Sequence, residues 1–271
     1  SLTAKINSNI TYFSSHNLIG YKEGISRPDE YLIFMAHWDH LGVNDELVGD
    51  QIFNGAADNA AGVAAIIELA RKFDQVQTER SVIFTALTLE ESGLLGSTYL
   101  AENPPFDLAN VVAGFNFDRV LPTGKTKDMA VIGYGASELE DYLEAELEKQ
   151  GRYINPDPNP EKGYFYRSDH ISFAKKGVPV LYSDDGFDLE EGGIEEGFKE
   201  IYDYTNFRYH GVNDEYDPSW NLEGFEQTID TIFNISKDLS NSSDWPNWYE
   251  GNEFRATRDA QLLSLIHISE P

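Results

Sequence analysis

Short runs of apolar, β-branched and aromatic residues recur along the chain, and stretches with a helical spacing of apolar residues separate them. Runs of this kind, without alternating polar positions, are typical of strands that are buried on both faces of a sheet. The predicted strands are 31–36, 81–87, 111–117, 129–133 and 178–183, and the predicted helices are 60–73, 137–151 and 222–239, with a further helix from 93. This alternation predicts an α/β fold, a three-layer sandwich in which helices flank a mostly parallel mixed sheet.

The stretches between these elements predict connections within one domain. No internal repeat and no long Gly/Ser-rich or Pro-rich linker divides the chain, so residues 1–258 are expected to form a single catalytic domain. Residues 153–166 predict an irregular connection, and the acidic, glycine-containing stretch 184–200 predicts either a solvated loop or a lid over a site.

The tail 259–271 is expected to lie outside the domain. Its end, LSLIHISEP (263–271), is apolar and stops abruptly, so we expect it either to dock as a terminal strand or to be non-native. His267, which lies in this tail, is assigned no chemistry.

The charge of the chain excludes some partners. Its 47 Asp and Glu residues outnumber its 20 Lys and Arg residues, which gives a net charge of -27. Polyanions are repelled by such a charge, so we expect no binding to nucleic acid. No apolar stretch reaches the roughly 20 residues of a membrane helix, so we expect no membrane insertion. Cysteine is absent, so a metal would have to be bound by His, Asp and Glu side chains.

Acidic and histidine residues follow the predicted strands at the points where the strands end. They are His37 and Asp39 after 31–36, Glu90 and Glu91 after 81–87, and Asp118 after 111–117, together with Asp58 just before helix 60–73. Because the carboxyl ends of parallel strands meet at one edge of a sheet, we expect these side chains to lie close together.

Each of these residues also has an ordinary structural explanation. Asp58 could cap the helix that follows it, and Glu90 and Glu91 could sit favourably at the N-terminus of the helix that begins near 93. Taken together, however, several carboxylates at one sheet edge would repel one another unless cations bridge them. The pattern therefore favours a shared metal centre.

Six segments of the chain resemble one family. They occur between about residues 30 and 240, in the order AHWDH, FNGAADNAAGVAAIIELAR, TLEESGLLGS, NFD, YRSDHISFAKKGVPVL and YHGVNDEYD. In this order they closely resemble the bacterial di-zinc aminopeptidases related to leucyl aminopeptidase and aminopeptidase Y. The resemblance implies a zinc exopeptidase-like fold, two zinc ions per chain, and removal of N-terminal, apolar residues from peptide substrates. It also implies export to the periplasm or the medium, and it gives no oligomeric state.

The resemblance further implies five metal ligands. Asp58 would bridge the two zinc ions, Glu91 and His210 would complete the shell of one ion, and His37 and Asp118 would complete the other. Each ion would then keep room for a bridging water, as catalytic zinc sites require. Cobalt or manganese could replace zinc, because nitrogen and oxygen ligands select poorly among these metals.

Other residues of the motifs resemble the residues that act around the metals. Glu90 resembles the general base that takes a proton from the bridging water and returns it to the leaving amine. Asp39 resembles the carboxylate that accepts the other imidazole N–H of His37. Tyr209 is expected either to donate a hydrogen bond to the oxyanion or to pack as an aromatic residue. Arg167 is expected either to contact the substrate backbone or to form a surface ion pair.

The remaining residues of the motifs are expected to be structural or to shape the site. His40 has no role in the resemblance and is expected to form local hydrogen bonds in its loop, whereas His170 is expected in a wall of the site. A pocket for the first side chain is expected partly from 184–209, with its aromatic residues Phe187, Phe198, Tyr202, Tyr204 and Phe207.

Three alternatives remain open. A glutamate-type carboxypeptidase of the same fold would need a basic pocket, for which Arg119, Arg167 and Arg208 are available. A glutaminyl cyclase would use one zinc, but its loop after the bridging aspartate differs from DNAAGVAA. A non-catalytic binding homologue would lack ligands or the base. The chain contains no HExxH, GxSxG, GxxxxGK[ST] or strand-linked GxGxxG motif, so thermolysin-like, serine-hydrolase, P-loop and dinucleotide chemistry are unsupported.

Overall fold

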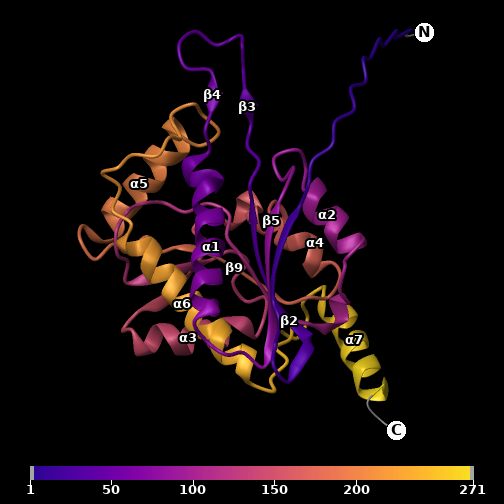
Figure 1. Ribbon diagram of the computed structural model, residues 1–271. Helices are drawn as coiled ribbons and strands as arrows, with labels where there is room; N and C mark the ends of the chain where they lie inside the picture. The colour runs from indigo at the N-terminus through magenta and orange to yellow at the C-terminus, as the bar shows by residue number, and fades with distance from the viewer. Residues whose placement is uncertain (1–2, 269–271) are drawn as a thin grey trace.

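The computed structural model describes residues 3–268, and its centre is a seven-stranded sheet (Figure 1). The strand order is β1-β5-β2-β6-β9-β7-β8. The strands are β1 (Leu18–Lys22), β2 (Arg27–His37), β5 (Arg80–Leu87), β6 (Val111–Asn116), β7 (Asp128–Val131), β8 (Tyr153–Pro156) and β9 (Val180–Asp185). Strands β5, β2, β6 and β9 run parallel, while β1 and β7 pair antiparallel with β5 and β9, which confirms the predicted mostly parallel mixed sheet.

Helices cover both faces of the sheet (Figure 1). One face packs against α1 (Ala61–Asp74), α3 (Leu139–Lys149) and α6 (Glu223–Asn241), and the other packs against α2 (Leu95–Glu102) and α4 (His170–Ala174). Each face of the sheet packs into its own hydrophobic core. Alternate residues of β2 point into these two cores: Leu32 and Phe34 into the core with α1, α3 and α6, and Ile33 and Met35 into the core with α2 and α4. The three-layer α/β sandwich is therefore confirmed.

Most predicted elements agree with the structure to within a few residues, and two connections differ. Residues 153–156, expected to be irregular, form the edge strand β8. Residues 193–200, expected to be part of a loop, belong to helix α5 (Gly193–Phe207). The glycines in this segment made a helix unexpected from the sequence. Gly197 is required in the helix because an added Cβ would lie 2.0 Å from the carbonyl oxygen of Phe187. The short elements are a hairpin, β3 (Gly42–Val43) and β4 (Ile52–Phe53), and the turns η1 (Ala56–Ala60), η2 (Leu108–Asn110), η3 (Pro160–Lys162) and η4 (Tyr164–Tyr166).

The C-terminal segment forms a helix, α7 (Arg255–Ile268), where a terminal strand was one expectation. Arg258 in this helix is fully buried and donates hydrogen bonds to the carbonyl oxygens of Val112 and Ala109. The helix therefore crosses the boundary expected at residue 258. The end of the tail, residues 269–271, and the side chain of His267 lie outside the described part of the chain.

Candidate metal centre

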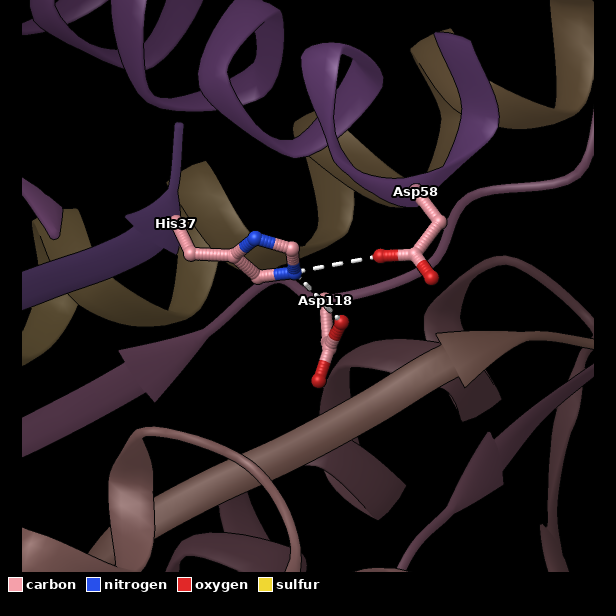
Figure 2. A group of neighbouring side chains, drawn as sticks. All are labelled: His37, Asp58 and Asp118. Atoms are coloured by element: carbon pink, nitrogen blue, oxygen red, sulfur yellow. Dashed lines mark hydrogen bonds and ion pairs between the residues drawn. The ribbon is translucent and has the colours of Figure 1, made fainter. Parts of the chain in front are cut away.

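Three of the expected ligands meet where β2 and β6 end. His37 is the last residue of β2, Asp58 lies in the turn that leads into α1, and Asp118 follows β6. The Nε2 atom of His37 lies 3.1 Å from Asp58 Oδ1 and 3.1 Å from Asp118 Oδ1 (Figure 2). His37 and Asp58 are buried, so these three side chains form a sheltered group of one imidazole and two carboxylates.

The other oxygen of Asp58 belongs to a second group. His210 Nε2 lies 3.4 Å from Asp58 Oδ2 and 3.1 Å from Glu91 Oε2. Asp58 therefore faces the two histidines with separate oxygens. In this way the structure brings together all five residues that were expected to bind metal.

The spacing of these atoms fits metal ions. A tetrahedral zinc ion with bonds of about 2.0–2.1 Å keeps neighbouring ligand atoms about 3.3 Å apart, which is close to the 3.1–3.4 Å found here. All the donors are nitrogen or carboxylate oxygen, a set that suits zinc and also cobalt or manganese. The five residues could thus hold two ions that share Asp58.

Asp214, which the sequence did not single out, fixes the turn that carries Asp58. Its carboxylate is fully buried and accepts hydrogen bonds from the backbone N–H groups of Ala57 and Asp58, at 3.0 Å from each nitrogen. The only signal in the sequence was an acidic residue four positions after His210. Ala57 and Asp58 are more than 150 positions away from Asp214 along the chain, so local pattern could not reveal these contacts.

Asn59, rather than Asp58, supports the start of helix α1. Its side-chain oxygen accepts a hydrogen bond from the N–H of Gly62, and its side-chain nitrogen donates to the carbonyl of Phe117. Asp58 makes no capping hydrogen bond to this helix. The capping explanation for Asp58 is therefore wrong, and both carboxylate oxygens of Asp58 remain directed at the histidines.

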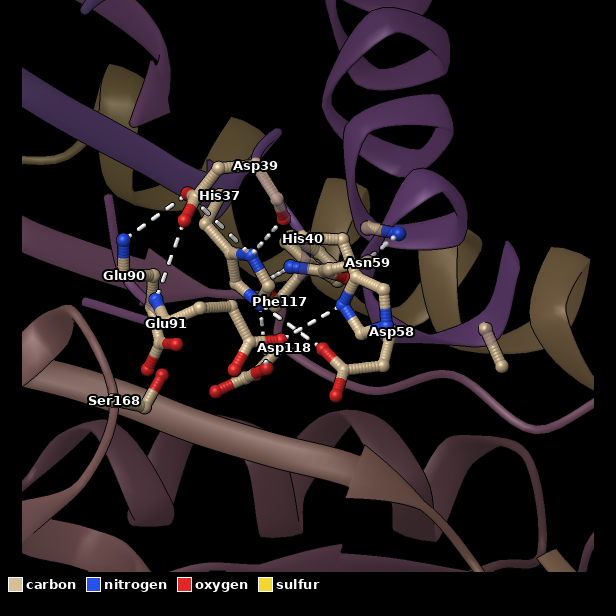
Figure 3. Close-up of polar contacts among 12 residues, drawn as sticks. His37, Asp39, His40, Asp58, Asn59, Glu90, Glu91, Phe117, Asp118 and Ser168 are labelled. Carbon is tan, nitrogen blue, oxygen red and sulfur yellow. Dashed lines mark hydrogen bonds and ion pairs between the residues drawn. The ribbon is translucent and has the colours of Figure 1, made fainter. Parts of the chain in front are cut away.

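Asp39 makes different contacts from those expected (Figure 3). Its carboxylate oxygen Oδ1 lies 3.9 Å from Nδ1 of His37, while its backbone carbonyl lies 3.1 Å from the same nitrogen. The carboxylate instead accepts hydrogen bonds from the backbone N–H groups of Glu90 and Glu91, at 3.0 and 3.3 Å. When the N–H at Nδ1 of His37 donates to the backbone carbonyl of Asp39, the lone pair at Nε2 is free to bind a metal. The carbonyl of Asp39 thus orients the ring in place of its carboxylate.

The two adjacent glutamates leave the end of β5 in a tight turn. Leu89 has the left-handed φ of 57°, which is unusual for a residue with a side chain, and it turns the chain at this point. The N–H groups of Gly93 and Leu94 then bond back to the carbonyl of Glu90. Because of this turn, Glu91 faces His210, and both Glu90 and Glu91 reach the lining of the adjacent cavity.

The pKa values of the histidines and glutamates around the candidate centre are strongly shifted. Burial lowers the pKa of His37, but Asp118 and Asp58 raise it more, so that it stands well above its ordinary value. Hydrogen bonds to Asp58 and Glu91 likewise raise the pKa of His210 to about 10. For Glu91, burial raises the pKa, but the nearby His210 and His40 lower it to about 2. A bound metal ion would replace the protons that these groups share.

The pKa of Glu90 is raised, whereas that of Glu91 is lowered. Burial, followed by the charge of Asp118, raises the pKa of Glu90 to about 9. A carboxyl group whose charged form is disfavoured by burial and by neighbouring acids is sensitive to any cation placed beside it. Glu90 thus carries a carboxyl group with a raised pKa next to the candidate metal centre.

A cavity of about 460 Å³ opens beside these residues. This volume lies in the range of small-molecule and cofactor sites. Its lining includes Asp58, Glu90, Glu91, Asp118 and His210 from the centre, and Arg119, Ala130, Ile132, Asp184, Phe187 and Ile201 from the surrounding elements. Arg119 and Asp184, whose Nη2 and Oδ2 atoms lie 2.5 Å apart, were not expected as a pair.

Tyr209 and Arg167 both line this cavity. The ring of Tyr209 is stacked on His210 with centroids 3.9 Å apart, so aromatic packing is present. The guanidinium of Arg167 lies 5.5 Å from the centre of the Tyr164 ring, and within residues 3–268 it forms no ion pair. Arg167 is therefore available to a molecule in the cavity.

The segment 184–209 lines the cavity as expected, but most of the aromatic residues named for the pocket do not. Of those five aromatic residues only Phe187 lines the cavity, because the others lie on helix α5 and point in several directions. Phe198 stacks on Phe187, Tyr204 is buried, and Tyr202 and Phe207 are exposed.

His170 is buried between Phe165 and Tyr182, at 4.8 Å from each ring centre. It does not line the cavity itself, whereas Tyr182 does. His170 therefore supports the wall of the site from behind.

The fold and the ligand set define an α/β protein with a candidate metal centre at the carboxyl edge of its sheet. A family model described as Peptidase family M28 matches residues 17–236. The chain belongs to peptidase family M28.

Individual relatives agree with this assignment. A probable zinc metalloprotease of Pyrenophora tritici-repentis is 28% identical over 209 residues, which cover 73% of this chain and 46% of that protein. The chain spans about half the length of curated relatives that it matches along most of its own length.

Solved structures show the same fold. The aminopeptidase from Aneurinibacillus sp. strain AM-1 has a TM-score of 0.61 at 22% identity, over 85% of this chain and 49% of that one. A glutaminyl cyclase of Porphyromonas gingivalis has a TM-score of 0.55 at 19% identity, over 82% of this chain and 77% of that one. At these identities the likeness establishes the fold only. Among the described residues, no helix is long and apolar enough to span a membrane.

Proposed function

We propose that the chain is the catalytic domain of a two-zinc aminopeptidase that removes N-terminal, apolar residues from peptides. The observation that carries this proposal is the shared carboxylate of Asp58, whose two oxygens face His37 and His210 at 3.1 and 3.4 Å. One zinc ion would be held by His37, Asp58 and Asp118, and the other by His210, Asp58 and Glu91. Bound zinc would polarise the carbonyl of the scissile bond and acidify a water molecule.

Glu90 moves the proton in this scheme. It lines the cavity beside the ligands. With zinc bound nearby, the ionised carboxylate of Glu90 would be favoured and would accept a proton from the attacking water and release it to the leaving amine. Asp39 fixes the backbone of Glu90 and thereby keeps its carboxyl group next to the reacting groups. Tyr209 and Arg167, which also line the cavity, would contact the oxyanion and the substrate backbone.

The cavity also favours a substrate with an apolar first side chain. Ala130, Ile132, Phe187 and Ile201 supply apolar lining close to the acidic residues of the centre. A free α-amino group would be attracted by those carboxylates, whereas an anionic chain end would be repelled by the overall charge of -27. Peptides are therefore the proposed partners. Export to the periplasm or the medium is proposed from the motif resemblance alone.

One observation favours a second candidate, a glutamate-type carboxypeptidase. Arg119, Lys162 and Arg167 line the same cavity, and these cations could bind the terminal carboxylate of a peptide. The aminopeptidase remains the better candidate, because Arg119 is already paired with Asp184.

Hydrolysis of a substrate panel tests these proposals. The panel contains aminoacyl amides with a free amino group, the same amides after N-acetylation, a peptide ending in glutamate, and a peptide beginning with glutamine. We expect cleavage of the free amides only. Release of C-terminal glutamate alone would show a carboxypeptidase, and ring closure of the N-terminal glutamine would show a glutaminyl cyclase.

A pair of adjacent substitutions tests the role of Glu90. Glu90→Gln should lower kcat by about 10²–10⁴ while the protein keeps both zinc ions. Glu91→Gln is the matched control and should lose one ion, since Glu91 faces His210. Zinc content measured by atomic emission separates the two effects, and loss of zinc from Glu90→Gln would contradict its assignment as the base.

A further inference from the structure

His40, the second histidine of AHWDH, lies beside a candidate metal ligand. Its Nδ1 atom is 2.8 Å from Oε1 of Glu91, and the two side chains are only 7% and 8% exposed (Figure 3). The sequence had suggested only local hydrogen bonds for His40. The structure instead places its imidazole against a residue from the end of another strand, β5.

The contact involves the oxygen of Glu91 that the metal centre leaves unused. Oε2 of Glu91 faces His210 at 3.1 Å, whereas Oε1 is buried and has no aligned hydrogen-bond donor among the described residues. The Nδ1 atom of His40 is close enough for a hydrogen bond, but the ring is not aligned for one in this structure. A buried carboxylate oxygen without a donor is costly, so His40 is the group that can satisfy Glu91.

The ring of His40 is also confined by its surroundings. Gly55 has a φ of 62°, and a Cβ added there would lie 2.7 Å from Cγ of His40 and 2.5 Å from the carbonyl oxygen of Asp58. On another side the ring of His210 approaches edge-on, with centroids 5.8 Å apart. His40 is thus packed between the turn that carries Asp58 and the histidine of the second group.

We propose that His40 is a positioning residue that holds Glu91 through Oε1, so that Oε2 faces the ion shared with His210 and Asp58. This inference rests on the proposed two-zinc function. It predicts that His40 increases the affinity of one zinc site without binding the ion. Residues that orient ligands in this way commonly contribute about 10–100-fold in metal affinity.

A direct ligand role for His40 is the competing explanation. Donor atoms of His40, Asp58 and Glu91 lie within 4.8 Å of one another, so the three could surround an ion. The 2.8 Å between Nδ1 and Oε1 is, however, shorter than the roughly 3.3 Å between two ligands of one tetrahedral zinc. A distance of 2.8 Å is typical of a hydrogen-bond donor and its acceptor.

Three substitutions of His40 separate these roles. Asparagine places an amide nitrogen near the position of Nδ1, glutamine places it near the position of Nε2, and alanine removes the donor. The zinc dissociation constants of both sites would be measured by competition with a chromogenic chelator. We expect His40→Ala and His40→Gln to weaken one site by about 10–100-fold, and His40→Asn to retain most of the affinity.

Two controls accompany these variants. His16 is exposed, and His16→Ala should leave both dissociation constants unchanged. Thermal unfolding of each metal-free variant shows whether it is folded at the assay temperature. If His40→Ala does not fold, the contrast between the asparagine and glutamine variants, which both carry an amide, still decides the question.

The outcomes are distinct. Unchanged zinc affinity in His40→Gln and His40→Ala would overturn the positioning role. An equal loss in the asparagine variant would overturn it in favour of a direct ligand. If the wild type binds fewer than two zinc ions, the two-zinc proposal fails and the role of His40 fails with it.

Discussion

The Nε2 atom of His37 and the Oδ1 atom of Asp58 lie 3.1 Å apart at the end of β2, and the other oxygen of the same carboxylate faces His210. Both halves of the candidate centre therefore depend on Asp58. We expect Asp58→Asn to lose both zinc ions. Asp118→Asn should lose only one, because Asp118 lies beside His37 and belongs to one group only. Zinc counted after gel filtration would check this difference. If Asp58→Asn kept one tightly bound ion, the shared carboxylate would be contradicted.

The stability of the metal-free protein should depend on pH through His210. Its pKa is raised from 6.5 to about 10 by hydrogen bonds to Asp58 and Glu91, so the folded state binds the proton more tightly than the unfolded state. This contribution is fully present below pH 6.5 and is lost as the pH rises towards 10. The raised pKa of His37 acts in the same direction.

Urea unfolding with a chelator present, at intervals from pH 6.5 to 9.5, would measure this loss. Zinc binds neutral imidazole, so adding zinc should remove the decline over the same window. The control is His210→Gln, whose metal-free form should show a weaker decline. A free energy of unfolding that increases with pH in the metal-free wild type would contradict the argument.

The fold could be predicted from sequence wherever an element is apolar enough to dominate its surroundings. The core strands β2, β5 and β6 are almost entirely buried along the predicted runs, so composition alone identified them. Helix α5 and the edge strand β8 bury few side chains. Their structure depends on packing against distant segments, which a local pattern does not record.

In the candidate site, too, some residues could be predicted from the sequence and others could not. His37, Glu91 and Asp118 could be located because each lies at the end of a strand, or shortly after it, at one sheet edge. The contacts of Asp214 and His40 could not, since each pairs residues brought together only by the folded topology.

Arg119 and Asp184 form an ion pair in the cavity wall that should stabilise the fold as a unit. Their side chains are 27% and 9% exposed, and Arg119 also lies over the ring of Tyr204. Arg119→Met would leave a nearly buried carboxylate without its partner, at a cost of about 3 kcal/mol. The double variant Arg119→Met with Asp184→Asn should recover part of this loss.

Denaturant unfolding of the two single variants and the double variant gives the coupling energy of this pair. A positive coupling of about 1–3 kcal/mol is expected. Simple additivity of the single effects would show that the pair does not act as a unit.

Helix α7 should be part of the folded domain at its start and dispensable near its end. Arg258 is fully buried against the carbonyls of Val112 and Ala109, and the Asp259 carboxylate accepts a hydrogen bond from Asn247. Gln261 donates to the carbonyl of Lys176, while Leu263 and Ser264 are exposed. Contacts with the body of the protein thus extend beyond the boundary expected at residue 258.

Truncation at two points distinguishes these parts of the helix. A chain that ends at residue 262 should unfold within about 0.5 kcal/mol of the full chain, as surface changes usually do. A chain that ends at residue 254 loses the buried Arg258 and leaves the carbonyl groups of Val112 and Ala109 without its hydrogen bonds, so it should be destabilised by about 3 kcal/mol. Urea unfolding of both chains checks this expectation. Equal stability of the two would show that the domain ends before α7, and equal destabilisation would show that residues beyond 262 are required for the fold.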